Sequence, residues 1–190
     1  MDRGGQGRAL GVRALSNAGF TIRPAGPEDA EAVGALLRAS YPPLMAAGYP
    51  ADVLERALPA MMKANPLLLR SGTYHLAVSE GGAVIGCGGW TREPPGAPCQ
   101  PVDPTVGHIR HFATHPDVLR RGVGSALLGR CIEEARVAGV RRLECLSSLV
   151  AERFYESAGF RAVGKRSVIL APGVQFDSIV MVLELTPPTG

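Results

Sequence analysis

Two glycines near the middle of the chain separate an apolar, strand-like run from an amphipathic helix, and they constrain the fold more than any other feature. The stretch at residues 119–128 reads Leu-Arg-Arg-Gly-Val-Gly-Ser-Ala-Leu-Leu. Before it, residues 109–113 are largely apolar, and the His-Pro-Asp at 115–117 ends that run as a turn would. After it, apolar residues recur at helical spacing until Gly139. The sequence therefore predicts a strand, a glycine turn and a helix in succession.

A helix that starts after a glycine turn is suited to binding an anion. Glycines let the chain turn tightly, and the N–H groups at the helix N-terminus, aided by the helix dipole, favour negative charge. Many helices also begin after glycine for structural reasons alone, so a second motif is needed. On this one feature, we expect a phosphate-bearing ligand.

The second motif lies at residues 145–160, Cys-Leu-Ser-Ser-Leu-Val-Ala-Glu-Arg-Phe-Tyr-Glu-Ser-Ala-Gly-Phe. Together with residues 120–124, it resembles the GNAT superfamily of acyl-CoA N-acyltransferases. That family has a Gln/Arg-x-x-Gly-x-Gly/Ala pyrophosphate loop, then a strand, a short helix carrying Phe-Tyr, and a Gly-Phe before another strand. The resemblance is close over residues 109–163 and looser over residues 21–185.

The resemblance implies an α/β (α+β) fold with a mixed, largely antiparallel central sheet flanked by helices and a splayed strand pair at the acyl-CoA site. Residues 20–187 are expected to form a single N-acetyltransferase domain after a flexible tail at residues 1–19. The implied function is direct transfer of an acetyl group from acetyl-CoA to a primary amine of a small molecule or peptide.

The resemblance also assigns cofactor-binding residues. Main-chain groups of Phe112, Ala113 and Thr114 are expected to pair with the pantetheine arm, and one N–H to support the thioester oxyanion. The pyrophosphate loop comprises Leu119, Arg120, Arg121, Gly122, Val123, Gly124 and Ser125.

Two positions depart from the family pattern. Leu119 occupies the leading Gln/Arg position, so side-chain help to the pyrophosphate must come from Arg120 or Arg121. Val150 stands where many relatives have Asn after the penultimate strand, which removes one hydrogen bond to the pantetheine arm or to water.

Tyr155 aligns with the tyrosine that protonates the leaving thiolate in many relatives. A phenol suits that role because its pKa, about 10, is near that of a thiol leaving group. The alternative is that Phe154 and Tyr155 only pack the short helix onto the sheet.

The general base is harder to assign because the strand before the loop carries no obvious carboxylate. His108 and His111 are candidates, and strand alternation predicts that His111 shares a face with Ile109 and Ala113. We select His111 as the candidate base, against the alternative of an ordinary packed histidine.

Residues outside the two motifs complete the predicted site. Glu93, at the end of a strand, is the alternative base, acting through water or binding a cationic amine. Tyr41, Tyr74 and Trp90 are predicted to line the acceptor pocket, although each also has an ordinary packing explanation.

The remaining elements follow from periodicity and turn residues. A strand is predicted at residues 21–24, followed by a helix from Pro27 that Tyr-Pro-Pro at 41–43 stops. A second helix spans residues 51–63 and ends at Asn-Pro. Further strands are predicted at residues 73–79 and 84–91, joined as a hairpin, and at 161–163 and 179–185, with residues 175–178 between the last two.

Composition excludes several other classes. The 190 residues, 46% hydrophobic, suffice for one core, and no apolar stretch approaches the ~20 residues that span a bilayer. The start lacks a signal peptide, so a cytoplasmic location without membrane partners is expected. A net charge of +3 with no basic cluster after residue 20 argues against nucleic acid. The four cysteines form no C-x-x-C pair, which predicts neither disulfides nor a metal site.

Three other functions are compatible with parts of the sequence. A dinucleotide-binding unit would use Gly122, Gly124 and Glu144, but its third glycine position is Leu127 and the second motif stays unexplained. A P-loop fails because Gly-Lys-Ser/Thr is absent. A non-catalytic acyl-CoA sensor remains open, and the apolar strand at residues 179–185 offers a seam for a homodimer.

Overall fold

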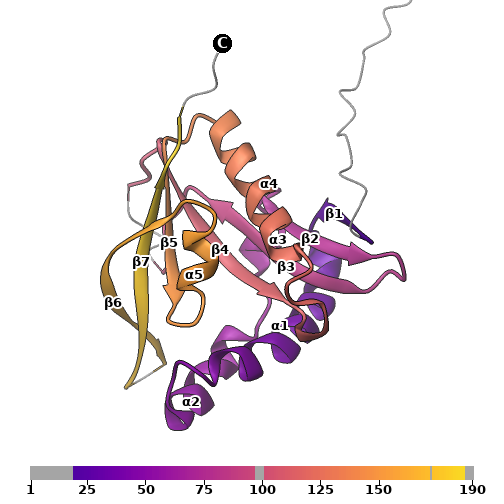
Figure 1. Cartoon of the computed structure of the whole chain (residues 1–190), viewed down its shortest axis with the longest axis vertical. Coiled ribbons are helices and arrows are strands. Elements are labelled where there is room, and N and C mark those ends of the chain that lie inside the picture. The colour runs from indigo at the N-terminus through magenta and orange to yellow at the C-terminus, as the bar shows by residue number, and fades with distance from the viewer. Residues whose placement is uncertain (1–18, 97–100, 172, 187–190) are drawn as a thin grey trace, which may run out of the picture.

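The computed structural model describes residues 19–96, 101–171 and 173–186. Among them, seven strands form one sheet in the order β1-β2-β3-β4-β5-β7-β6 (Figure 1). Neighbouring strands are antiparallel except β4 and β5, which run parallel. The mixed, largely antiparallel sheet predicted from the sequence is thereby confirmed. Its strands are β1 (Phe20–Pro24), β2 (Tyr74–Ser79), β3 (Val84–Thr91), β4 (Val106–Thr114), β5 (Arg142–Ser148), β6 (Arg161–Ala171) and β7 (Val174–Glu184).

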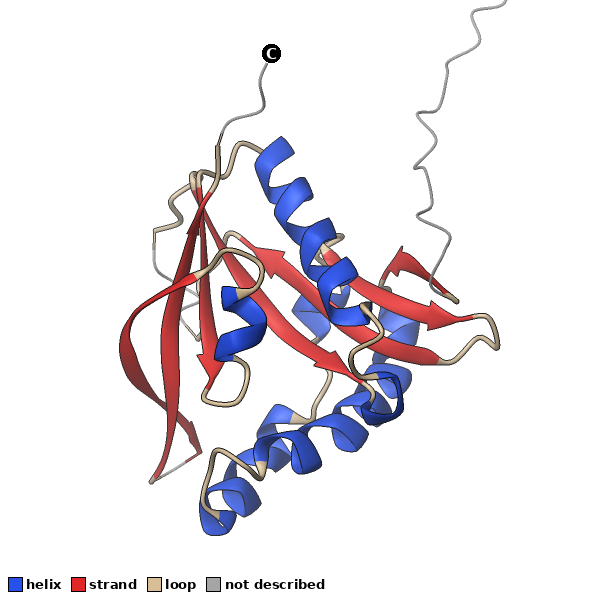
Figure 2. Cartoon of the chain, in the orientation of Figure 1, coloured by secondary structure: helices blue, strands red, loops and turns tan. Residues whose placement is uncertain are grey.

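Helices cover both faces of the sheet (Figure 2). They are α1 (Ala30–Met45), α2 (Ala51–Met61), α3 (Pro66–Leu69), α4 (Val123–Val137) and α5 (Glu152–Glu156), with short 3-10 turns at η1 (Pro27–Asp29) and η2 (Pro116–Val118). Successive residues of β2 point to the two opposite faces of the sheet and pack against different helices. Leu76 packs in the core cluster that contains α1 and α2, whereas Ala77 packs with Val123 and Leu127 of α4.

Helix α1 continues past the point where the sequence predicts its end. Pro42 and Pro43 lie inside it, although proline removes helical N–H donors and usually stops a helix. Met45, which follows the two prolines, is buried in the core cluster that contains α1 and α2, and this packing favours continuation of the helix. The turn before the prolines is also fixed. The Ser40 hydroxyl donates to the Thr114 carbonyl at 3.0 Å, and the Tyr41 hydroxyl donates to the Phe112 carbonyl at 3.2 Å, which hold this turn of the helix against β4.

The C-terminal hairpin also differs from the prediction. Residues 175–178, expected between two strands, belong to β7. Phe176 is buried there and stacks on Tyr49, with ring centroids 4.1 Å apart. Because β7 pairs with β5 on one side and β6 on the other, neither of its hydrogen-bonding edges is open to a second copy. The homodimer seam expected along residues 179–185 stays a prediction.

Strands β4 and β5 separate soon after they start. Their pairing runs from Val106↔Arg142 to His108↔Glu144, and along the described length of both strands it goes no further. Figure 1 shows the two strands diverging as a V, with α5 over the opening. The splayed pair implied by the resemblance is present. We call the last paired level, His108 and Glu144, the apex of the V.

A β-bulge interrupts β4 opposite β3. Cys87 pairs with Ala113 and Gly89 with Arg110, so two residues of β4, His111 and Phe112, face the single Gly88. His111 takes a positive φ of 54°, and a Cβ at position 88 would lie 2.6 Å from the Phe112 ring, so the bulge needs glycine opposite it.

The bulge changes which side chains share a face. Ile109 packs in the cluster beneath α4 and α5, whereas Ala113 packs in the cluster of α1. The His111 ring points to the carbonyl of Met61 in α2. The prediction that Ile109, His111 and Ala113 lie on one face is therefore wrong, because strand alternation does not survive the extra residue.

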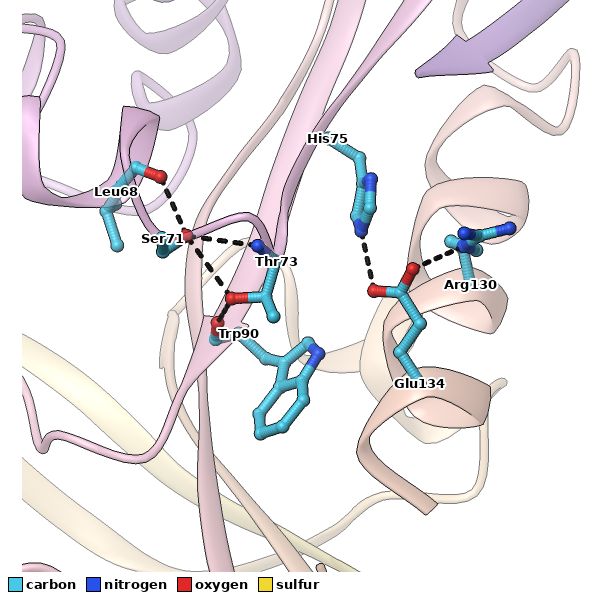
Figure 3. Close-up of polar contacts among 7 residues, drawn as sticks. All are labelled: Leu68, Ser71, Thr73, His75, Trp90, Arg130 and Glu134. Carbon is cyan, nitrogen blue, oxygen red and sulfur yellow. Dashed lines mark hydrogen bonds and ion pairs between the residues drawn. The ribbon is translucent and has the colours of Figure 1, made fainter. Parts of the chain in front are cut away.

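A buried polar network fastens α4 to β2 (Figure 3). His75, 1% exposed, lies with its Nε2 2.7 Å from Glu134 Oε2, and Arg130 Nε donates to Glu134 Oε1 at 2.6 Å. Burial opposes ionisation of Glu134, but the hydrogen bonds from His75 and Arg130 outweigh it and lower the carboxyl's pKa. The helix that follows the glycine loop is thus held by a charged contact as well as by apolar packing.

We predict that Glu134→Gln lowers the free energy of unfolding by about 1–3 kcal/mol at pH 7, because it weakens hydrogen bonds to a buried partner. The folded-state pKa of Glu134 is lowered, so its contribution is present above the unfolded value, about 4.3, and is lost as the pH falls below it. Urea unfolding at pH 7 and at pH 3 measures both effects. Glu133→Gln, which removes an exposed partner of Arg136, is the matched control. Equal losses in the two variants at pH 7 would contradict the prediction.

Candidate functional site

The loop between β4 and α4 has the backbone geometry of an anion-binding turn. Arg120 and Gly122 both lie in the left-handed region, with φ of 65° and 80°. The first helical hydrogen bond of α4 runs from the Ala126 N–H to the Gly122 carbonyl at 2.9 Å. The amides of residues 122–125 have no hydrogen-bond partner among the described residues, and no side chain caps the helix. Such free amides at a helix N-terminus favour an anion.

The side chains of this loop add positive charge. Arg120 and Arg121 are exposed, and neither forms an ion pair with any residue in the described part of the chain. Leu119 is 39% exposed and offers only an apolar surface. The two arginines are therefore the side chains of the loop that are suited to an anion.

Gly124 brings the start of α4 close to its neighbours. A Cβ at this position would lie 3.2 Å from the Phe154 ring and 3.3 Å from Thr114 Oγ1. The free amides therefore lie next to the end of β4 and next to α5, the helix that carries Tyr155.

The open edge of β4 leads away from this loop. The His115 N–H donates to the Ile85 carbonyl of β3 at 2.9 Å, and Ala113 pairs with Cys87, so the alternate residues Phe112 and Thr114 turn their main-chain groups toward the V. Their carbonyls accept hydrogen bonds from Tyr41 and Ser40. Their N–H groups have no β5 partner at this level. The strand therefore presents main-chain donors to a ligand in the opening.

Tyr155 lies under the opening in an aromatic cluster. Its ring centroid is 5.0 Å from that of Phe154, 5.6 Å from Phe160 and 6.4 Å from Phe112. Burial raises the pKa of Tyr155 well above its usual value, and the hydroxyl lies beside the thiol of Cys145. The phenol is therefore neutral at neutral pH and holds a proton that it can give.

The other residues expected in the site lie in different surroundings. His111 Nε2 is 2.8 Å from the Met61 carbonyl and donates to it, and burial lowers the pKa of the ring. Glu93 is exposed beyond the end of β3, where its main-chain carbonyl accepts from Thr91 and Arg110.

The predicted acceptor residues are core residues. Tyr41, Tyr74 and Trp90 are 7%, 1% and 4% exposed, and the Tyr74 hydroxyl donates to the His111 carbonyl at 3.0 Å. Tyr41 and Tyr74 thus hold the bulge of β4 in place. Their burial favours the packing explanation over a role in lining a pocket.

Sequence reasoning did not single out the pair at the apex. His108 Nδ1 and Glu144 Oε2 are 3.7 Å apart, on adjacent parallel strands. They border a cavity of about 390 Å³, whose wall also includes Arg92, Asp103, Arg166 and Val180. The available signal was a charged residue, Glu144, between the buried Leu143 and Cys145 of a strand. Its partner depends on the register of two strands far apart in the sequence.

Comparison with known proteins identifies the class. Residues 32–160 match the model of the Acetyltransferase (GNAT) family. The match covers more than half of the chain, which therefore belongs to this family. None of the curated proteins compared with the chain matches it.

Solved structures share the fold at low sequence identity. A GCN5-related N-acetyltransferase from Rhodopseudomonas palustris is 22% identical, with a TM-score of 0.70, over 94% of this chain and 100% of that one. The PaiA N-acetyltransferase from Thermoplasma acidophilum, solved in complex with coenzyme A, is 16% identical, with a TM-score of 0.66, over 87% and 99%. The ribosomal-protein-S18-alanine N-acetyltransferase from Escherichia coli is 19% identical, with a TM-score of 0.60, over 90% and 96%.

The described residues were compared with the requirements of a metal site and of a membrane-spanning helix, and they meet neither. No group of three or more His, Cys, Asp or Glu among them could hold a metal ion. No helix in the described ranges has the length and apolar character needed to cross a bilayer. The predicted tail, apart from Gly19, and Cys99 lie outside the described residues.

Proposed function

We infer that the protein is an acetyl-CoA-dependent N-acetyltransferase that transfers the acetyl group directly to a primary amine of a small molecule or peptide. One observation carries this proposal. The free amides of residues 122–125 lie at the end of β4 whose open edge presents main-chain donors to the V. A phosphate-bearing ligand with an extended, amide-rich arm fits that combination, and acetyl-CoA is such a ligand.

The binding roles follow from the geometry. The amides of residues 122–125 would bind the pyrophosphate, with Arg120 and Arg121 adding positive charge. Phe112 and Thr114 would pair with the pantetheine arm through their main chains, while Ala113 stays paired with β3. One of these N–H groups would stabilise the thioester oxyanion, a contribution of roughly 3 kcal/mol in characterised enzymes.

Tyr155 would give its proton to the departing thiolate. Its hydroxyl lies beside Cys145, the residue after Glu144 in β5, so it is close to the apex of the V. Because burial keeps the phenol neutral, the proton is present at neutral pH.

Direct transfer is favoured over a covalent cysteine intermediate. Cys87, Cys131 and Cys145 are buried, and burial raises the pKa of each thiol, to about 12 for Cys87 and Cys145. The thiolate, which is the nucleophilic form, is therefore scarce at these three described positions.

Of the two predicted bases, Glu93 has the more accessible side chain. His111 commits its Nε2 to Met61, whereas the Glu93 carboxylate is exposed and interacts electrostatically with His108 and Arg110. Glu93 would help to attract a cationic amine. The alternative function is a non-catalytic acyl-CoA sensor. Two observations favour it: Leu119 stands where the family has Gln or Arg, and the His111 Nε2 is hydrogen-bonded to the Met61 carbonyl.

We predict that Gly124→Val weakens binding of acetyl-CoA and of CoA by about tenfold or more, since its side chain would meet Phe154 and Thr114 and displace the start of α4. The shift of the thermal midpoint with each ligand measures this, because a ligand that binds the native state stabilises it by mass action. NAD and ATP serve as comparison ligands. Gly129→Ala, in the same helix with open space around it, is the matched control and should keep the shift. A wild-type shift with NAD alone would contradict the proposed cofactor.

We predict that Tyr155→Phe lowers turnover about a hundredfold while it keeps the acetyl-CoA thermal shift, because it removes the acid and leaves the aromatic packing. Release of CoA with a panel of amines measures turnover. Tyr49→Phe removes a hydroxyl bonded to Leu149 and Asp177 and should cost stability without the same loss of turnover. Unchanged turnover in Tyr155→Phe would remove the acid role. Acetyl-CoA binding without CoA release for any amine would favour the sensor.

A further inference from the structure

The cavity at the apex has the size and position of an acceptor site. Its volume, about 390 Å³, lies in the range of small-ligand pockets. Val106, His108 and Ile109 of β4 and residues 144–146 of β5 form one wall, and Arg166 of β6 contributes to the other. The open edge of β4 runs from the glycine loop toward this cavity, so a ligand arm that follows the edge would end beside it.

His108 is placed to take a proton in that cavity. Its side chain is 13% exposed, and burial lowers the pKa of its ring. Glu144 and Glu93 oppose this shift, and Arg110 adds to it. The imidazole is therefore mostly neutral at neutral pH, with Glu144 3.7 Å away to stabilise the protonated form.

The two proton-carrying groups lie on opposite faces of the sheet. Side chains alternate along a strand, so Glu144 and Cys145 point to different faces of β5. The His108 side chain lies next to Glu144 on the face with the cavity, whereas the Tyr155 side chain of α5 packs with Cys145 on the other face. An amine that enters from the cavity would therefore meet the thioester on the side opposite Tyr155. In direct transfer this arrangement lets the base act on the amine while the acid acts on the leaving thiolate.

Besides His108 and Glu144, three charged residues line the cavity, and two of them are already engaged in other contacts. Arg92 donates to the Pro104 and Ala138 carbonyls and stacks on Trp90, and Asp103 accepts from Thr105. Arg166 is exposed and has no ion pair within the described part of the chain. The cavity thus has the His108 imidazole and the Glu144 carboxylate on one wall, and on another wall the Arg166 guanidinium, which has no ion-pair partner among the described residues.

We propose that this cavity binds a compact amine that also carries a carboxylate, such as an amino acid or a short peptide. Arg166 binds the carboxylate, His108 is the general base, and Glu144 positions and stabilises it. The inference rests on the proposed function and deepens it by naming the acceptor class.

The proposed reaction moves the acetyl group from the sulfur of acetyl-CoA to the nitrogen of the acceptor. His108 takes one proton from the acceptor ammonium, and the freed lone pair forms the N–C bond to the acetyl carbonyl carbon. The C–S bond breaks, and Tyr155 gives its proton to the sulfur. The second proton that the nitrogen loses restores Tyr155 through solvent, so the reaction releases one proton overall, from His108.

The acceptor class is tested with pairs of amines in which an amide replaces the carboxylate, compared at a pH-corrected concentration of the free amine. Release of CoA is measured with glycine, β-alanine and glycylglycine, each beside its C-terminal amide. We expect kcat/KM to favour the carboxylates at least tenfold, and Arg166→Gln to abolish that preference by raising KM for the carboxylates alone. Lys165→Gln, the exposed neighbour on β6 that lies outside this cavity, should keep it.

The base is tested in the same assay by its pH dependence. Wild-type kcat/KM should fall at acid pH with a limb below about 6.5, the usual histidine pKa, because burial lowers that of His108. His108→Gln should lower kcat about a hundredfold and remove the limb, while the acetyl-CoA thermal shift persists. Glu144→Gln should move the limb to lower pH, because it removes a charge that raises the pKa of His108.

The outcomes separate the inference from the function on which it rests. Equal rates with carboxylates and amides, or an intact preference in Arg166→Gln, would overturn the acceptor class. An unchanged acid limb in His108→Gln would overturn the base. CoA release from no amine at all would overturn the proposed function and, with it, this inference.

Discussion

The separation of β4 from β5 after the His108–Glu144 pair is the constraint on which the rest of the structure depends. Where two strands separate, their main-chain N–H and C=O groups lose their hydrogen-bond partners. Burying such unpaired groups costs free energy unless other groups form hydrogen bonds with them. Here the carbonyls of Phe112 and Thr114 accept hydrogen bonds from Tyr41 and Ser40, and the N–H groups face the opening. Both hydroxyl groups come from the turn of α1 that immediately precedes Pro42 and Pro43.

Separate contacts anchor the elements around the opening. Glu134 ties α4 to His75 of β2, so the helix that carries the free amides is held on the sheet by a hydrogen bond as well as by apolar packing. The bulge at His111, opposite Gly88, turns Phe112 toward the aromatic cluster of α5. The residues proposed to bind acetyl-CoA, the proposed acid and the candidate base therefore come from elements that are separately anchored, and such preorganisation avoids an entropic cost at each turnover.

The sequence predicts those parts of the site that depend on local backbone chemistry. The glycine turn before α4 and the position of Tyr155 in its short helix follow from neighbouring residues and from the family motif. Features set by contacts between distant segments were not predicted. The bulge breaks the strand alternation on which the placement of His111 depends. Burial of Met45 in the core favours continuation of α1 past its prolines. The pairing of His108 with Glu144 requires the register of parallel strands. Aromatic residues suit both ligand pockets and protein cores, and residue type alone does not distinguish these locations. The sequence therefore predicts a pocket position for three aromatic residues that the structure buries in the core, Tyr41, Tyr74 and Trp90.

The proposed contacts to acetyl-CoA are made by main-chain N–H groups, so amide hydrogen exchange with and without acetyl-CoA measures them directly. We predict slower exchange at Phe112, Thr114 and residues 122–125 when acetyl-CoA is bound, with little change in the hairpin of β2 and β3 near residues 79–84. Tight binding of acetyl-CoA with no protection of these amides, or with protection confined to other segments, would contradict it.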